Sequence, residues 1–292
     1  MQCKGPILTL NNGVEMPAFG LGVFQSEKAE TGAAVQWAIE SGYGLIDTAA
    51  AYKNEEEVGQ AIAESGVARD EVFITTKMHP NDFGHDTALR AFDTSMAKLG
   101  IDVLDLYLLH WPVPRNFEAT IASWKVCERL LAEGRVRAIG VCNFKPAHID
   151  ALLAQSDIVP AVNQIELHPF FVQEDHDIAH RKLGIITQAW SPIGGVHRYR
   201  PEGGEPSDPL HHPTVTTLAD KYGKTAAQIV LRWQIDLGHS AIPKSVKLAR
   251  IKENIDIFDF SLLPDEIAAI SALDTGLRGG ADPETRWTPE GK

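Results

Sequence analysis

The sequence predicts an α/β protein: a (β/α)₈ barrel of the TIM type with an N-terminal β-hairpin and enlarged βα loops. Three observations carry this prediction. The 292 residues fall in the range of a single α/β barrel, so we expect one domain over 1–292. Short apolar runs alternate with longer amphipathic segments along the chain. The apolar runs number eight, as a closed barrel of this class requires.

The predicted strands follow a hairpin over 7–16, which turns at Asn11-Asn12-Gly13. Most are almost continuously apolar, as in Val72-Phe73-Ile74, which is typical of parallel strands buried on both faces. The eight ranges are 19–21, 44–47, 72–77, 104–111, 136–142, 161–167, 184–189 and 240–243.

Helices are predicted between these strands, over 28–40, 54–64, 86–99, 117–132 and 146–154. Before the last strand, Thr225 and Gln228 form a capping box that starts another helix. An open doubly wound sheet is the alternative, but the nearest match to G-x-G-x-x-G, Gly20-Leu21-Gly22, lacks the third glycine. The barrel is therefore preferred, with the Gly/Pro-rich segment 194–213 as an enlarged βα loop.

Composition limits the classes of function. Apolar residues make up 44% and charged residues 23%, which is ordinary for a globular protein, and the formal net charge of −12 disfavours nucleic acid and anionic membranes as partners. No apolar run approaches the roughly 18 to 20 residues of a membrane span. Three cysteines without C-x-x-C spacing support neither a disulfide framework nor a zinc ribbon. We expect a cytoplasmic protein.

Four polar residues lie at or just beyond the ends of predicted strands: Asp47, Tyr52, Lys77 and His110. Because catalytic groups of such barrels come from the carboxyl ends of different strands, all four are expected to converge. The set suits carbonyl reduction, in which the carbonyl oxygen must receive a proton. Lys77 is expected to lower the pKa of Tyr52, Asp47 to pair with Lys77, and His110 to orient the carbonyl oxygen.

Six segments spread over the chain resemble the aldo-keto reductase family. They are Ile46-Asp47-Thr48-Ala49 with Tyr52, Ile74-Thr75-Thr76-Lys77, Leu109-His110-Trp111-Pro112, Gly140-Val141-Cys142-Asn143-Phe144, Val162-Asn163-Gln164-Ile165-Glu166-Leu167-His168-Pro169 and Ile242-Pro243-Lys244-Ser245. The resemblance implies an NADPH-dependent reductase with a catalytic tetrad of Asp47, Tyr52, Lys77 and His110, in which Tyr52 is the proton donor.

The resemblance also implies a nicotinamide site. It places the carboxamide against Cys142, Asn143 and Gln164, and stacks Trp190 on the nicotinamide ring. Two positions depart from the family pattern, because Cys142 replaces the usual Ser and Trp190 the usual Tyr. The run Ala189-Trp190-Ser191-Pro192, with the compact loop after Trp111, resembles the bacterial branch of 2,5-diketogluconate reductase.

A basic segment follows the last strand. Residues 243–254 carry Lys244, Lys247, Arg250 and Lys252 against Glu253, so four minus one gives a net of +3 in a chain of −12. Such a reversal of sign indicates an anion site, for which the 2′-phosphate of NADPH is the candidate. The resemblance assigns Lys244, Ser245 and Arg250 to this phosphate, and Glu253 and Asn254 to the adenine.

Phe24, Trp111 and Trp287 are the predicted substrate-pocket residues, and they suit small apolar and polyol carbonyls alike, with dicarbonyls or keto-sugar acids as candidate substrates. Arg278 and Arg286 in the C-terminal segment are candidates to bind the carboxylate of a keto acid, although an arginine in such a segment is usually only solvated. By resemblance we expect a monomer.

Two other functions stay open: an NADPH-binding regulatory subunit with little turnover, and a glycosidase with Asp47 and Glu166 as paired carboxylates. His176 and His180 have the spacing of metal ligands, but a surface helix is preferred and no metal is expected.

Overall fold

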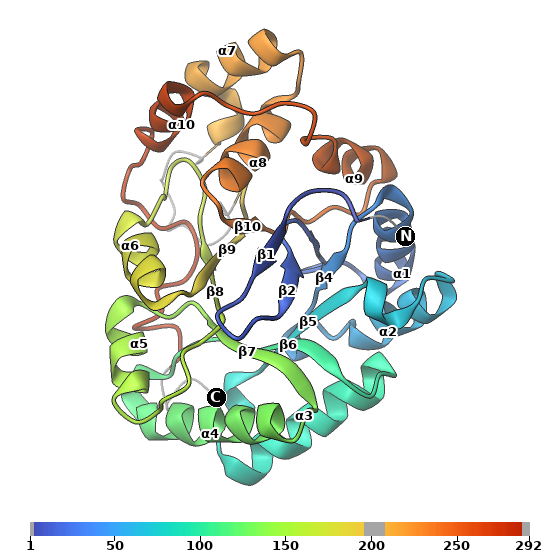
Figure 1. Cartoon of the computed structure of the whole chain (residues 1–292), viewed down its shortest axis with the longest axis vertical. Coiled ribbons are helices and arrows are strands. Elements are labelled where there is room, and N and C mark those ends of the chain that lie inside the picture. Colours follow the sequence, from blue (N-terminus) through green and yellow to red (C-terminus); the bar gives the residue numbers. More distant parts are fainter. Residues whose placement is uncertain (1–2, 196–207, 288–292) are drawn as a thin grey trace.

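The computed structural model describes residues 3–195 and 208–287, and eight parallel strands form a barrel surrounded by helices (Figure 1). Each strand pairs with the next one along the chain, in the order β3 to β10. The strands are β3 (Leu21–Gly22), β4 (Leu45–Asp47), β5 (Phe73–Met78), β6 (Leu104–Leu109), β7 (Val136–Cys142), β8 (Val162–Glu166), β9 (Ile186–Trp190) and β10 (Ser240–Ala241). The predicted barrel is confirmed, with all eight strands within a few residues of their expected positions.

The barrel closes where β10 meets the start of β3. Gly20 N–H donates to Ala241 O at 3.0 Å and Gly22 N–H to Pro243 O at 3.1 Å. Because Pro243 has no N–H, the regular ladder of β10 ends before it. A Cβ atom on Gly22 would lie 2.8 Å from Ile242 O, so the two glycines of Gly20-Leu21-Gly22 permit close strand packing. Close strand packing therefore explains the two glycines that partly match the nucleotide-binding motif.

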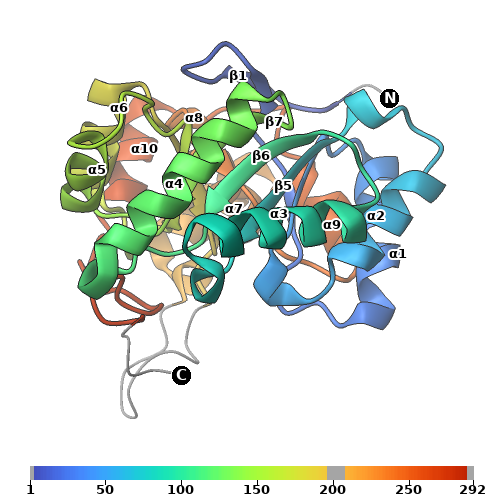
Figure 2. The ribbon, with the colours of Figure 1, turned by 90° about the horizontal axis from the view of Figure 1, so that it is seen from below.

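Ten helices cover the outside of the barrel in the part of the chain that the structure describes (Figures 1 and 2). The predicted capping box is confirmed at the start of the helix before the last strand, where the Thr225 side chain accepts a hydrogen bond from Gln228 N–H. The helices are α1 (Lys28–Ser41), α2 (Glu55–Glu64), α3 (His85–Leu99), α4 (Phe117–Ala132), α5 (Pro146–Leu153), α6 (Glu174–Leu183), α7 (Pro213–Tyr222), α8 (Ala226–Asp236), α9 (Leu248–Ile255) and α10 (Pro264–Ser271). Within residues 3–195 and 208–287, none is long and apolar enough to cross a bilayer.

The N-terminal hairpin, β1 (Ile7–Thr9) with β2 (Glu15–Pro17), covers the end of the barrel at which the strands begin (Figure 2). Leu10 and Met16 from the hairpin are buried with Leu45, Phe73 and Leu106 from the strand starts. This end is thus filled with apolar side chains, and the carboxyl ends of the strands are left for a site. Most of the predicted loop 194–213, namely residues 196–207, lies outside the described residues.

Candidate active site

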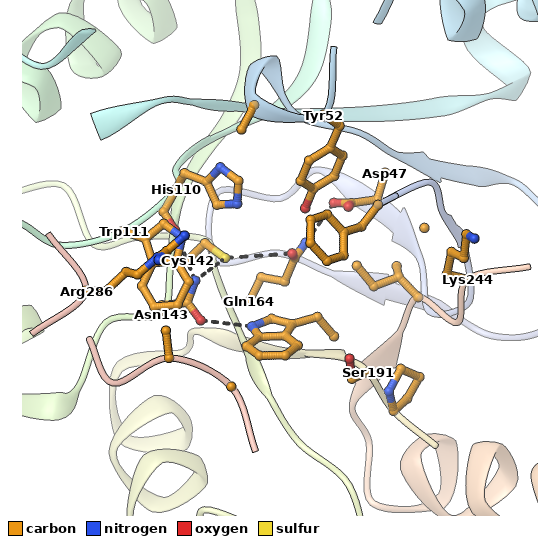
Figure 3. A pocket seen from close by; sticks show the side chains of 18 of the residues that line it. Asp47, Tyr52, His110, Trp111, Cys142, Asn143, Gln164, Ser191, Lys244 and Arg286 are labelled. Carbon is orange, nitrogen blue, oxygen red and sulfur yellow. Dashed lines mark hydrogen bonds between the residues drawn. The ribbon is translucent and has the colours of Figure 1, made fainter. Parts of the chain in front are cut away.

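A cavity of about 480 Å³ opens at the carboxyl ends of the strands (Figure 3). Its wall includes strand-end residues from several strands and also the C-terminal segment, which crosses over the barrel. Asp47, Tyr52 and His110 contribute to one side, and Asn143 and Gln164 to another. Strand ends that are far apart in sequence therefore meet in one cavity, as the fold class predicts.

A buried ion pair lies behind this wall and reaches it through Asp47. Lys77 Nζ, on β5, lies 2.6 Å from Asp47 Oδ1 at the end of β4, and both side chains are almost wholly buried. The same ammonium donates to Thr48 O at 2.9 Å and to Tyr52 Oη at 3.2 Å. All three donors of Lys77 are thus used, and the ammonium directly contacts the Tyr52 hydroxyl.

Burial and charge act in opposite directions on these groups. Burial lowers the pKa of Lys77, but the Asp47 carboxylate, together with the neighbouring Tyr52 and Cys142, outweighs burial and raises this pKa above its ordinary value, so Lys77 is a cation. Burial raises the pKa of Tyr52, and the nearby Lys77 charge, which lowers it, does not compensate. Lys77 therefore lowers the pKa of Tyr52 as predicted, but the net pKa lies above its ordinary value because burial has the larger effect. At neutral pH the phenol is protonated.

His110 lies just beyond β6, with its ring edge-on to that of Tyr52 at a centroid distance of 5.7 Å. Burial, reinforced by the Lys77 charge, holds the pKa of His110 well below its usual range. The imidazole is thus neutral at neutral pH. A neutral ring can donate one hydrogen bond from one nitrogen to a ligand in the cavity.

Asn143 connects several parts of the cavity wall. Its φ of 64° is left-handed, a conformation that Asn tolerates better than most residues. The side-chain amide donates to His110 O at 3.1 Å, and its oxygen accepts from Trp190 Nε1 at 2.9 Å. Trp190, where the usual residue is Tyr, therefore has its indole ring held against Asn143 by a hydrogen bond.

Gln164 and Cys142 complete this wall. Gln164 Nε2 donates to Asp47 Oδ2 at 2.7 Å, so both carboxylate oxygens of Asp47 accept hydrogen bonds. Cys142 Sγ lies 3.7 Å from Gln164 Oε1 and 3.1 Å from Asn143 Nδ2. Because burial raises the pKa of the Cys142 thiol, it is protonated and not a reactive thiolate.

The basic segment lies beside the cavity. Lys244 contributes to its wall, whereas Arg250 is exposed on α9. Ser245 is buried, and its hydroxyl accepts from Lys247 N–H at 3.1 Å. Glu253 and Asn254, the predicted adenine residues, lie in the last turn of α9, where Glu253 accepts from Thr225 Oγ1 at 3.0 Å. The structure thus places Lys244 at the cavity and the other four along the segment leading away from it.

All three predicted substrate residues line the cavity. Phe24 stacks obliquely on Tyr52 with ring centroids 5.0 Å apart, and Trp111 lies next to His110 at 6.5 Å. Trp287 comes from the C-terminal segment and meets His79 edge-on at 4.9 Å. His79 also lines the cavity and was not predicted to do so. Its position two residues after Lys77, at the end of a strand, is where site residues of such a barrel are expected.

Three sequence interpretations are corrected by the tertiary structure. Arg278 is only 17% exposed and lies over Phe171, so it is not simply solvated. Arg286 is exposed, but it lines the cavity. The helix α6 is not purely superficial, because His180 is buried and lies 2.9 Å from both Asn163 Nδ2 and Thr187 Oγ1.

Glu166 is buried outside the cavity wall, bound to backbone amides, and so does not pair with Asp47 as a glycosidase carboxylate.

Comparisons with known proteins agree with this geometry. The profile of the Aldo/keto reductase family matches residues 18–275. A morphine 6-dehydrogenase of Pseudomonas putida is 53% identical over 97% of this chain and 96% of its own length. A glyoxal reductase of Bacillus subtilis is 45% identical over 94% of this chain and 95% of its own. The crystal structure of a Bombyx mori aldo-keto reductase in complex with NADP is similar with a TM-score of 0.87 and 39% identity, covering 96% of this chain and 95% of that one.

Proposed function

Because the chain belongs to the aldo/keto reductase family, we propose that it reduces aldehydes and ketones to alcohols with NADPH. One observation carries the proposal: the Lys77 ammonium bridges Asp47 at 2.6 Å and the Tyr52 hydroxyl at 3.2 Å beside the cavity. A buried cation held against a phenol in this way suits a group that donates a proton and leaves a phenolate behind.

The described residues fit a nicotinamide. The indole of Trp190 offers a flat surface held by Asn143, and the side-chain amides of Asn143 and Gln164 line the same cavity. Lys244 in the wall and Arg250 on α9 offer cations for phosphate groups. Bound there, NADPH would supply the hydride for the carbonyl carbon.

The chain's own groups account for the remaining chemistry. Tyr52 donates its proton to the carbonyl oxygen, and Lys77 stabilises the phenolate that is left, because its positive charge favours the ionised form. Asp47 keeps Lys77 charged and in place. His110, neutral at neutral pH, donates a hydrogen bond that orients the carbonyl oxygen.

For substrates, we propose small dicarbonyls or keto-sugar acids, within a branch resembling 2,5-diketogluconate reductase. Phe24, Trp111 and Trp287 offer aromatic surfaces, and Arg286 adds a cation to the same cavity for a polar or anionic second group. Two relatives, a glyoxal reductase and a morphine 6-dehydrogenase, support a carbonyl or alcohol as the substrate. The substrates in these two names differ widely in size.

Loss of nicotinamide absorbance with a panel of glyoxal, methylglyoxal, a keto-sugar acid and an aromatic aldehyde tests the proposal directly. We expect turnover with at least one dicarbonyl or keto acid. NADPH binding without turnover of any member would favour the alternative, a regulatory subunit.

Arg250→Ala tests the cofactor choice. Hydrogen bonds to charged groups contribute about 1.5 to 3 kcal/mol, so we expect the Kd for NADPH to rise by about 10 to 100-fold, while NADH, lacking the 2′-phosphate, is affected far less. Lys252→Ala is the matched control, since this exposed cation lies two residues further along α9 and so on another side of the helix. Equal losses for both cofactors, or a wild type that prefers NADH, would refute the assignment.

Cys142→Ser restores the usual family residue beside Asn143 and Gln164. A hydroxyl is a better hydrogen-bond donor than a thiol, so we expect the Kd for NADPH to hold or fall slightly when measured by fluorescence titration. Marked weakening would mean that the buried thiol contributes by packing, which the smaller oxygen does not reproduce.

A further inference from the structure

The C-terminal segment, residues 276–287, crosses the mouth of the cavity. Gly280, Ala281, Arg286 and Trp287 all belong to the cavity wall. On its outer side the segment makes exposed ion pairs, in which Lys145 Nζ lies 3.0 Å from Asp282 Oδ1 and 3.3 Å from Glu284 Oε1. Exposed pairs of this kind contribute only about 0 to 1 kcal/mol, so they do not explain how the segment is fixed.

A stronger attachment lies below the segment. Glu166, the last residue of β8, is wholly buried, and its two carboxylate oxygens accept from consecutive backbone amides: Oε1 from Gly279 N–H and Oε2 from Gly280 N–H, each at 2.8 Å. His168 Nε2 lies 3.1 Å from Oε1 and Arg278 Nη1 3.8 Å from Oε2. A buried carboxylate needs such partners, because an unpaired buried charge is very costly.

The same contact brings the segment against Trp190. A Cβ atom on Gly280 would lie 2.6 Å from Trp190 Cη2 and 2.8 Å from Glu166 Oε2, so a glycine is required for this approach. Gly280 therefore lies between Glu166, at the end of β8, and the indole ring that lines the cavity.

We propose that Glu166 is a positioning residue, which holds the C-terminal segment across the cavity through Gly279 and Gly280 and so sets how tightly the carbonyl substrate is bound. The proposal rests on the reductase function proposed above. Glu166 is outside the cavity wall and does not touch the reacting atoms; it acts through the placement of Arg286 and Trp287, about six residues further along the segment.

Glu166→Gln is the first test, because it keeps the side chain's volume but leaves one acceptor oxygen where there were two. The side-chain NH₂ group of the variant then points at one of the two backbone N–H groups. Both are donors, so no hydrogen bond forms between them. Loss of a hydrogen bond to a charged group corresponds to about a tenfold change or more. We expect KM to rise about tenfold for a carboxylate-bearing or aromatic carbonyl, with much less change for glyoxal, which has neither a carboxylate for Arg286 nor a ring for Trp287. We expect kcat and the Kd for NADPH to stay within about twofold.

A second readout does not depend on catalysis. Hydrogen exchange of the peptide containing Gly279 and Gly280 is expected to quicken in Glu166→Gln by about tenfold, since both amides depend on the carboxylate. Gly280→Ala reaches the same state by a different route, because its methyl group displaces the segment while Glu166 stays intact; it should raise KM for the same substrates.

Two controls separate this role from general destabilisation. Glu266→Gln alters another largely buried carboxylate that accepts from a backbone amide, Leu263 N–H at 2.8 Å, but is remote from the cavity. Glu284→Gln neutralises one exposed carboxylate of the same segment, which contacts Lys145 at 3.3 Å and His148 at 3.2 Å. Neither should change KM.

Unchanged KM in Glu166→Gln and Gly280→Ala, an equal rise in Glu266→Gln, or unchanged exchange at Gly279 and Gly280 would each overturn the proposal. If the wild type reduces no carbonyl at all, the proposed function fails instead, and the exchange measurement still tests the link.

Discussion

Tyr52→Phe is expected to abolish nearly all carbonyl reduction while leaving NADPH binding largely intact. The substitution keeps the aromatic ring against Phe24 and removes only the hydroxyl, which lies 3.2 Å from Lys77 Nζ. General acid catalysis typically contributes about 10² to 10⁴-fold, and this sets the expected fall in kcat. Steady-state kinetics with a responsive dicarbonyl, together with an NADPH titration, measure the two quantities.

Tyr107→Phe is the matched control for this variant. Tyr107 is wholly buried in β6, and its hydroxyl has no hydrogen-bond partner within residues 3–195 and 208–287. Removal of that hydroxyl should leave kcat unchanged. Near-normal turnover in Tyr52→Phe, or an equal loss in both variants, would contradict the role of Tyr52 as proton donor.

The pKa of Tyr52 also predicts a pH profile. Burial raises this pKa above its ordinary value of about 10, and the acid form that donates the proton predominates below the pKa. The contribution of Tyr52 to the reduction rate should therefore be constant through the neutral range and be lost only as the pH rises far into the alkaline range.

Lys77→Met is expected to be similarly damaging, for two reasons that can be separated. Loss of the ammonium removes the charge that lowers the pKa of Tyr52, so the phenol becomes a poorer acid and any alkaline fall in the residual rate moves to still higher pH. It also leaves Asp47 buried without its ion-pair partner, which typically costs about 3 to 5 kcal/mol of stability. We expect both a large loss of kcat and a lower melting temperature.

The double variant Lys77→Met with Asp47→Asn distinguishes these effects. It removes both charges, so a good part of the lost stability should return, while the reduction rate should not. A Lys77→Met protein that keeps its rate and pH profile would show that Lys77 is only a structural charge.

Much of the fold follows from local pattern. The continuous apolar runs around Val72 and Leu106 are parallel strands, and the helix after Thr225 starts at its predicted capping box. The ends of the barrel's first and last strands were less predictable. Pro243 interrupts the hydrogen-bond ladder of the last strand. The barrel closes there through backbone hydrogen bonds from Gly20 to Ala241 and from Gly22 to Pro243, which join residues over 200 positions apart.

The convergence of Asp47, Tyr52 and Lys77 could also be predicted, because the topology of a parallel barrel brings strand ends together whatever the intervening sequence. The net direction of the Tyr52 pKa could not. It depends on how completely the surrounding chain excludes water, and here desolvation outweighs the neighbouring charge.

By itself, then, the sequence determined the order of strands and helices, the strand ends that carry chemistry and the family that these motifs resemble, since each depends on residue types at fixed local spacing. Only the tertiary structure decided which arginine of the C-terminal segment faces the cavity, that His180 is buried, and that Glu166 binds Gly279 and Gly280. The physical reason is separation along the chain: Glu166 and Gly279 are 113 residues apart, and no local pattern encodes a hydrogen bond between a side chain and so distant a backbone amide.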